Sequence, residues 1–224
     1  MSQKPNKGPL REPVLHKLYQ HYLVSEESAD FIKKVAGYYT VGALERLAQA
    51  DHRVSRRAAL LAIGFLGDYQ SNQVVGRALH DDDRVVRLIA ENSLRHLWER
   101  DGNSLQQKKL HKIISLNEDL KFKEVLPLAN SLLERAPWFA EAWNQRAIAY
   151  YHLNEFQKAV HDCHQALEIN PYHFPAAVGM ANCYLELEDG FAALESLRRA
   201  KRLNPDMDGV NAQIDYLERT LEGK

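Results

Sequence analysis

The sequence predicts an all-α fold in which helical hairpins stack side by side into an α-α superhelix, or α-solenoid. Three prolines, Pro137, Pro171 and Pro205, stand 34 residues apart, which is a spacing typical of repeated helix pairs. A second period, of 31 residues, relates segment 51–66 to segment 82–97. Apolar residues make up 45% of the chain, enough for a core. Because one hairpin cannot cover its own apolar face, we expect each hairpin to pack on the next.

The first residues predict an arm followed by capping helices. Residues 1–13 contain three prolines, a glycine and three basic residues, so we expect a flexible N-terminal arm. Apolar residues at helical spacing then predict helices over 14–22 and 28–39. We expect these helices to cap the array at the start of an N-terminal half that spans 14–103.

The 31-residue period predicts two short hairpins over residues 41–100. It aligns Asp51 with Asp82 and Arg56 with Arg87, each pair at the start of a long helical run. The two runs resemble the second helices of HEAT-type repeats. That resemblance implies that aspartates and arginines join adjacent repeats, in a structural ladder of Asp51, Arg56, Asp82 and Arg87. The short junction 101–103 predicts that both halves stack rigidly as one rod.

The 34-residue period predicts three longer hairpins and a capping helix over residues 104–224. Aligning 140–171 with 174–205 pairs alanines with alanines and Tyr150 with Tyr184, and an Asn-Pro step ends each copy. These residues resemble the tetratricopeptide repeat (TPR), with Trp143 near the start of the better copy. The units run over about 106–139, 140–173 and 174–207, followed by an amphipathic helix over 208–222.

The resemblance to TPR proteins implies a binding groove on the concave face, lined by the first helix of each pair. Asparagine side chains there can bond a peptide backbone, and aliphatic side chains can form pockets. The alternative is that several of these residues pack beneath neighbouring helices. The expected groove residues are Leu110, Ile114, Asn144, Ile148, Tyr151, His152, Val178, Asn182 and Leu185.

Some TPR proteins clamp a C-terminal carboxylate with lysine, arginine and asparagine. The corresponding places hold Leu110, Ile114, Gln145, Pro175 and Gly179, so we do not expect that activity. An internal or partly apolar peptide, or a folded partner, fits the residues better.

Two alternative functions remain open from the sequence. Arginines in the 31-residue copies could form rows that bind nucleic acid, but the neighbouring aspartates and the net charge of −1 argue against this. The other alternative is an accessory subunit or enzyme of the HEAT-like lyase type, which would need a deep pocket with a nucleophile. Both cysteines, Cys163 and Cys183, are expected to be packed instead.

No recognisable catalytic motif, cofactor motif or membrane-spanning segment is present in the sequence. The run His161-Asp162-Cys163-His164 contains metal-binding residue types, but Cys163 takes the inward repeat position, so no metal site is expected. Two cysteines without a disulfide framework suit the cytoplasm. We therefore expect a non-enzymatic adaptor or scaffold that binds a peptide or protein, with its oligomeric state left open.

Overall fold

The computed structural model describes residues 12–207, 209–221 and 223, and all regular elements in that part of the chain are helical. The expected all-α class and helical-repeat architecture are confirmed. The predicted arm over residues 1–13 lies, except for Glu12 and Pro13, outside the described residues.

The N-terminal half consists of short helices that end in the long helix α6. Thr40 and Asp83 each precede a helix, and their side chains accept backbone N–H groups of Ala43 and Val86, so both act as N-caps. The elements are α1 (Val14–Ser25), α2 (Ser28–Tyr38), α3 (Val41–Leu47), α4 (Arg53–Leu66), η1 (Tyr69–Ser71), α5 (Asn72–Arg77), η2 (Ala78–His80) and α6 (Arg84–Glu99).

The C-terminal half consists of three helix pairs and a final helix. This half begins with a capping box. The Asn103 side chain accepts the backbone N–H of Gln106, and the Gln106 side chain accepts the backbone N–H of Asn103. Alanines such as Ala159 and Ala166 are fully buried where paired helices approach closely. The helices are α7 (Ser104–Glu118), α8 (Phe122–Leu133), α9 (Ala140–His152), α10 (Phe156–Ile169), α11 (Phe174–Glu186), α12 (Gly190–Leu203) and α13 (Val210–Leu221).

Helix α13 covers the open end of the stack with one apolar face. Val210, Ile214 and Leu217 are buried against α12, whereas Tyr216 on the opposite face is exposed. The helix therefore removes from water the apolar surface that a further hairpin would otherwise cover.

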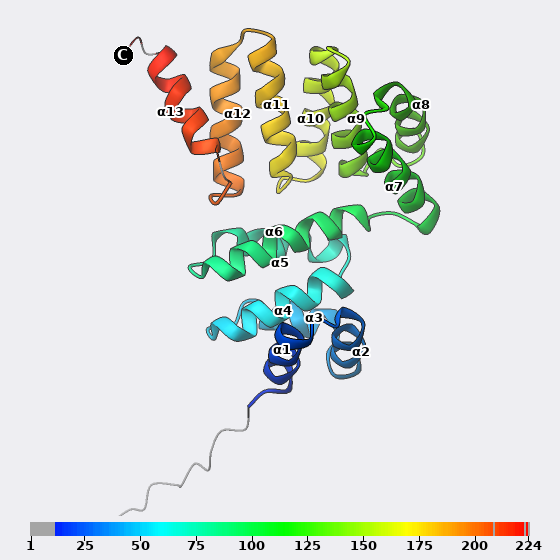
Figure 1. Cartoon of the computed structure of the whole chain (residues 1–224), viewed down its shortest axis with the longest axis vertical. Helices are drawn as coiled ribbons and strands as arrows, with labels where there is room; N and C mark the ends of the chain where they lie inside the picture. Colours follow the sequence, from blue (N-terminus) through cyan, green and yellow to red (C-terminus); the bar gives the residue numbers. More distant parts are fainter. Residues whose placement is uncertain (1–11, 208, 222, 224) are drawn as a thin grey trace, which may run out of the picture.

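The helices of the two halves cross where the halves meet, an arrangement that the expectation of one rod did not specify. In Figure 1 helices α9 to α13 stand in a row, and α5 and α6 lie crosswise beneath that row. Trp98 of α6 stacks on His173, which lies in the loop between α10 and α11, with ring centroids 4.4 Å apart. The N-terminal half thus packs on the loops at the edge of the C-terminal row, because those loops carry aromatic and polar side chains that α5 and α6 can bury.

A buried amide chain reinforces this junction. Trp98 Nε1–H donates to Asn72 Oδ1 at 2.7 Å, and Asn72 Nδ2–H donates to Asn170 Oδ1 at 2.9 Å. Gly76 lets the backbone of α5 approach the ring of Tyr172 closely, since a Cβ at residue 76 would lie only 2.4 Å from Tyr172 Cδ1. Polar groups buried in this way stabilise one relative placement of the halves.

Candidate functional site: a groove between the two halves

Two adjoining cavities lie along α9 and share Asn144, Ile148 and Pro175. The first, which we call the apolar cavity, has a volume of about 220 Å³ and is bounded by α9, α10 and α11. The second, which we call the α6 cavity, has a volume of about 190 Å³ and is bounded by α6, α7, α9 and the start of α11. Together they form a groove, referred to below as the α9 groove.

The apolar cavity reaches the two cysteines of the protein, Cys163 and Cys183. Gly179 keeps its floor open, because a Cβ at this position would lie 3.3 Å from Cys163 Sγ. Burial raises the pKa of the Cys183 thiol to about 11 and raises the pKa of the Cys163 thiol further. Both sulfurs therefore act as apolar surface and are poor nucleophiles at neutral pH.

The α6 cavity is built by both halves of the protein. Arg95, Trp98 and Glu99 of α6 form one wall, and Ile114 of α7 lies on another. Arg95 bonds Glu91 at 3.1 Å and lies over the ring of Phe174, so its charge is already engaged. The junction between the halves therefore also shapes the groove.

A buried carboxylate orders the polar side chains of the groove. Ala176 N–H donates to His173 Nδ1, so Nε2 of that ring carries the hydrogen that faces Glu141 Oε2 at 2.8 Å. Asn144 and Gln145 also donate their amides to Glu141, at 3.2 and 2.7 Å. Burial alone raises the pKa of Glu141, but these hydrogen bonds, with that of His173 the largest, lower it overall.

Asn144 presents an acceptor to the groove. Its side chain is held by Glu141 through Nδ2, and the residue is only 6% exposed. Among the hydrogen bonds of the described residues, none engages Asn144 Oδ1. Because Asn144 lines both cavities, this oxygen is positioned to accept a hydrogen bond from a bound molecule.

The structure brings six of the nine predicted groove residues to these cavities: Ile114, Asn144, Ile148, Tyr151, His152 and Asn182. The prediction for Leu110 was wrong, since this side chain is 0% exposed and lies in the core between α7 and α8. Val178 is half-buried against α12 and α13, and Leu185 is 39% exposed but outside both cavities. Sequence reasoning missed Arg95, Trp98 and Glu99.

The predicted aspartate-arginine ladder exists with different partners. Arg56 makes a two-point bond with Asp81 and a further bond with Asp82, whereas Asp51 contributes only its backbone carbonyl. Arg87 pairs with Asp206, in the linker between α12 and α13, at 2.7 Å. Arg56 therefore reaches the acidic turn before α6, whereas Arg87 reaches the linker before α13 and so joins the two halves of the protein.

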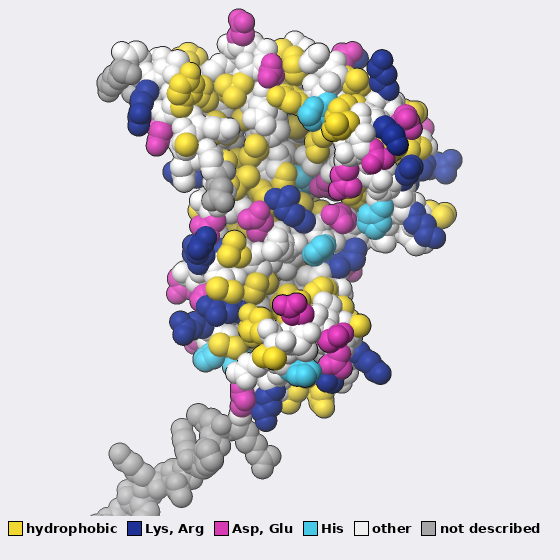
Figure 2. Space-filling model, in the orientation of Figure 1, with side chains coloured by type: hydrophobic (Ala, Val, Ile, Leu, Met, Phe, Trp, Pro, Cys, Tyr) yellow, Lys and Arg dark blue, Asp and Glu magenta, His cyan; other side chains and the backbone are white. Residues whose placement is uncertain are grey.

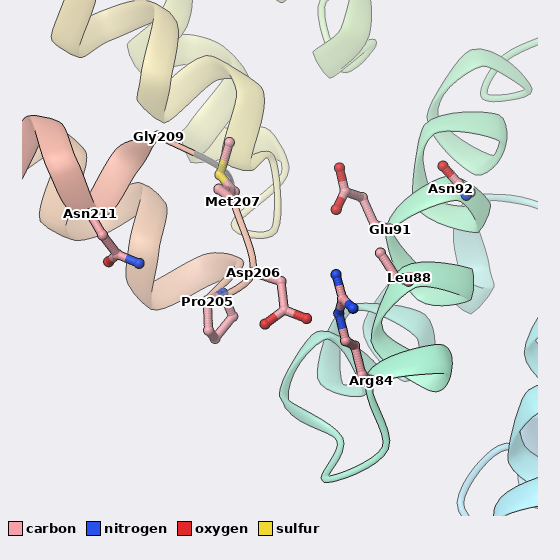
Figure 3. A pocket seen from close by; sticks show the side chains of 9 residues that line it. All are labelled: Arg84, Leu88, Glu91, Asn92, Pro205, Asp206, Met207, Gly209 and Asn211. Atoms are coloured by element: carbon pink, nitrogen blue, oxygen red, sulfur yellow. The ribbon is translucent and has the colours of Figure 1, made fainter.

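A wider cleft of about 650 Å³ separates α6 from the linker that leads to α13. Figure 3 shows Arg84 and Glu91 of α6 facing Asp206 across it, with Met207 above them. Its lining is largely polar and charged, so it offers no enclosed site for an apolar group.

The described residues contain no group of three or more histidine, cysteine, aspartate or glutamate side chains placed to hold a metal ion. Asp162 bonds Arg146 instead, at 2.6 Å. In the described part of the chain no helix combines the length and apolar character needed to cross a bilayer.

Comparison with known proteins agrees with the helical-repeat fold. The model of the tetratricopeptide repeat family matches residues 140–173, which contain α9 and α10. This hairpin is thus similar to the tetratricopeptide repeat. Sperm-associated antigen 1 of Rattus norvegicus is 24% identical over 155 residues, covering 69% of this chain but 17% of that protein. A TPR repeat-containing protein of Rhizobium etli is 24% identical over 143 residues, covering 64% of this chain and 69% of that protein.

Solved TPR structures share the fold. The first TPR of Spaghetti (RPAP3), bound to the HSP90 peptide SRMEEVD, has a TM-score of 0.50 at 19% identity and covers 52% of this chain and 93% of that chain. The first TPR domain of human RPAP3 has a TM-score of 0.51 at 19% identity and covers 55% and 96%. The chain spans far less than two thirds of the rat relative, and the HEAT-like resemblance of residues 41–100 stays a prediction.

Proposed function

We propose that the protein is a non-enzymatic adaptor or scaffold that binds an extended peptide or protein segment in the α9 groove. The observation that carries this proposal is the buried Asn144, which lines two adjoining cavities and whose Oδ1 has no hydrogen-bond partner among the described residues. An extended segment can donate a backbone N–H to this oxygen while placing a side chain in the apolar cavity. The peptide bound to the similar TPR structure supports the same class of ligand.

The groove residues argue against a clamp for a C-terminal carboxylate. Of the described residues that line the two cavities, Arg95 is the one lysine or arginine, and it is already engaged with Glu91. A free carboxylate would enter this groove without a cation to offset its loss of hydration. We therefore favour an internal segment over a chain terminus.

The ion pairs of the arginine rows argue against the alternative of nucleic-acid binding. Arg56, Arg57 and Arg87 each pair with an aspartate at 2.5 to 2.7 Å. Paired arginines contribute little to a phosphate-binding surface, because the field of each is offset by its partner. The buried free thiols are compatible with a reducing compartment such as the cytoplasm.

Affinity purification from a native extract tests the proposal. The wild type is compared with a double variant, Ile148→Glu with Asn182→Ala, which alters the apolar cavity. Gln157→Ala, at an exposed position of α10, is the matched control. We expect partners retained by the wild type and the control to be depleted by at least about tenfold with the double variant, as for the loss of interface anchors. Unchanged partners would reject the α9 groove as the site, provided that circular dichroism shows the variant folded.

A further inference from the structure

Three carboxylates, those of Glu99, Glu141 and Glu186, lie in or beside the α9 groove, and the arginine that lines it, Arg95, is paired with Glu91. Glu99 lies on the wall of the α6 cavity, and its nearest basic group is the ring of His111 at the long distance of 3.9 Å. Beyond the apolar cavity, Tyr151 donates its hydroxyl to Glu186 at 3.2 Å. Glu141 adds a buried negative charge behind the amides. Figure 2 shows charged side chains of both signs along the band that α6 occupies, beneath the upright helices.

The apolar cavity between these carboxylates fits one side chain. Its volume of about 220 Å³ is bounded by Ile148, Tyr151 and Pro175, together with the two sulfurs. A leucine, methionine or phenylalanine would bury its apolar surface in this cavity, and that burial favours binding. The neighbouring Asn144 Oδ1 fixes where the backbone of the segment must pass.

We propose that the α9 groove selects an extended segment in which a large apolar residue is flanked by lysine or arginine, and that Glu99 of α6 selects the cation. The proposal rests on the function proposed above and names the chemistry of its ligand. Glu99 comes from the N-terminal half, so the segment is recognised by both halves at once. An acidic segment such as SRMEEVD would meet Glu99 and Glu186 with like charge and is expected to bind poorly.

Selection from a random peptide library tests this proposal. The nonapeptides are displayed with both ends blocked by linkers, and the full chain is the immobilised target. We expect enriched sequences to contain a leucine, methionine or phenylalanine with lysine or arginine within two positions. With Glu99→Lys as the target we expect the apolar residue to persist while acidic neighbours replace the basic ones.

Two matched variants locate the binding. An enriched basic peptide, labelled with fluorescein, is titrated by fluorescence anisotropy. We expect Glu99→Gln to weaken binding about two- to fivefold, the range of a partly exposed ion pair. Glu168→Gln, an exposed glutamate on α10, should leave it unchanged. Gly179→Leu, which fills the apolar cavity, should weaken it by at least about tenfold.

The outcomes separate the two proposals. Enrichment of acidic peptides that still depends on Gly179 would overturn the preference for a cation and leave the groove as a binding site. The same preference for basic peptides with Glu99→Lys as with the wild type would overturn the role of Glu99. Failure to enrich any peptide that depends on Gly179 would overturn the proposed function itself.

Discussion

Trp98 of α6 and His173 of the loop before α11 stack at 4.4 Å with their planes inclined by only 19°. The same histidine bonds Glu141, which holds the amides of the groove. The contact that joins the two halves is therefore also part of the support of the proposed binding site.

Replacing Trp98 with alanine should destabilise the whole protein. The indole is 2% exposed and contacts both His173 and Phe174, so its removal leaves a cavity at the junction. We expect the free energy of unfolding to fall by about 3–5 kcal/mol, measured by urea denaturation. Trp138→Ala is the control, because Trp138 is 50% exposed, and it should change the value by less than about 0.5 kcal/mol. Equal effects of both substitutions would contradict this description of the junction.

Gly76→Ala should also destabilise the protein, although alanine is the better helix former. A Cβ at residue 76 would lie 2.4 Å from the ring of Tyr172, so either the ring or α5 must move, at a cost of about 1–3 kcal/mol. Gly42→Ala on α3 is matched in type, but its Cβ would meet no atom within 4 Å. We expect it to stabilise by up to about 1 kcal/mol. Thermal unfolding of both variants measures the difference, and stabilisation by Gly76→Ala would show that the halves do not pack as described.

Glu141→Gln should lower stability at neutral pH and less so in acid. The pKa of Glu141 is lowered in the folded protein, so the carboxylate contributes stability that is fully present above about pH 4.5. That contribution is lost as the pH falls through the folded-state pKa. We expect Glu141→Gln to cost about 1.5–3 kcal/mol at pH 7. In urea denaturation the difference between variant and wild type should shrink between pH 5 and pH 3, and a constant difference over that interval would contradict the assignment.

Both thiols should react slowly in the native protein. With a pKa of about 11, roughly one Cys183 in a thousand is a thiolate at pH 8, and burial leaves Cys163 with fewer still. We expect Ellman's reagent to modify the native protein at least about 100-fold more slowly than the protein unfolded in urea. Rapid modification of either cysteine without unfolding would mean that the apolar cavity is open to solvent at its floor.

Local patterns in the sequence predicted the hairpins but not how the halves meet. The spacing of Pro137, Pro171 and Pro205 follows from helix pairs of constant length, so it predicts where α7 to α12 lie along the sequence. The contact between Trp98 and His173 joins residues from different repeats, and no period in the sequence relates them. For this reason the crosswise placement of α6 was not predictable from either repeat register.

The repeat pattern also explains why some of the predicted groove residues line the cavities and Leu110 does not. Asn144, Ile148 and Asn182 lie in the two best-aligned copies, where the repeat positions fix the side that faces the groove. Leu110 lies in the weaker third copy, where one apolar residue can be assigned to the groove or to the core, and the structure places it in the core. No sequence pattern marks Glu99 as a groove residue, because its place in the α6 cavity depends on which loops α6 packs against.

Hydrogen exchange with a bound peptide tests the central claim most directly. The full chain is saturated with a peptide enriched in the library selection, and amide exchange is followed by mass spectrometry. Exchange should slow in α9, in α11 and at the end of α6, including residues 95–99, while the exposed face of α10 and the α1–α2 pair remain unchanged. Protection confined to the α1–α2 pair or to the wide cleft beside α13, with none in α9, would contradict a binding groove built by both halves.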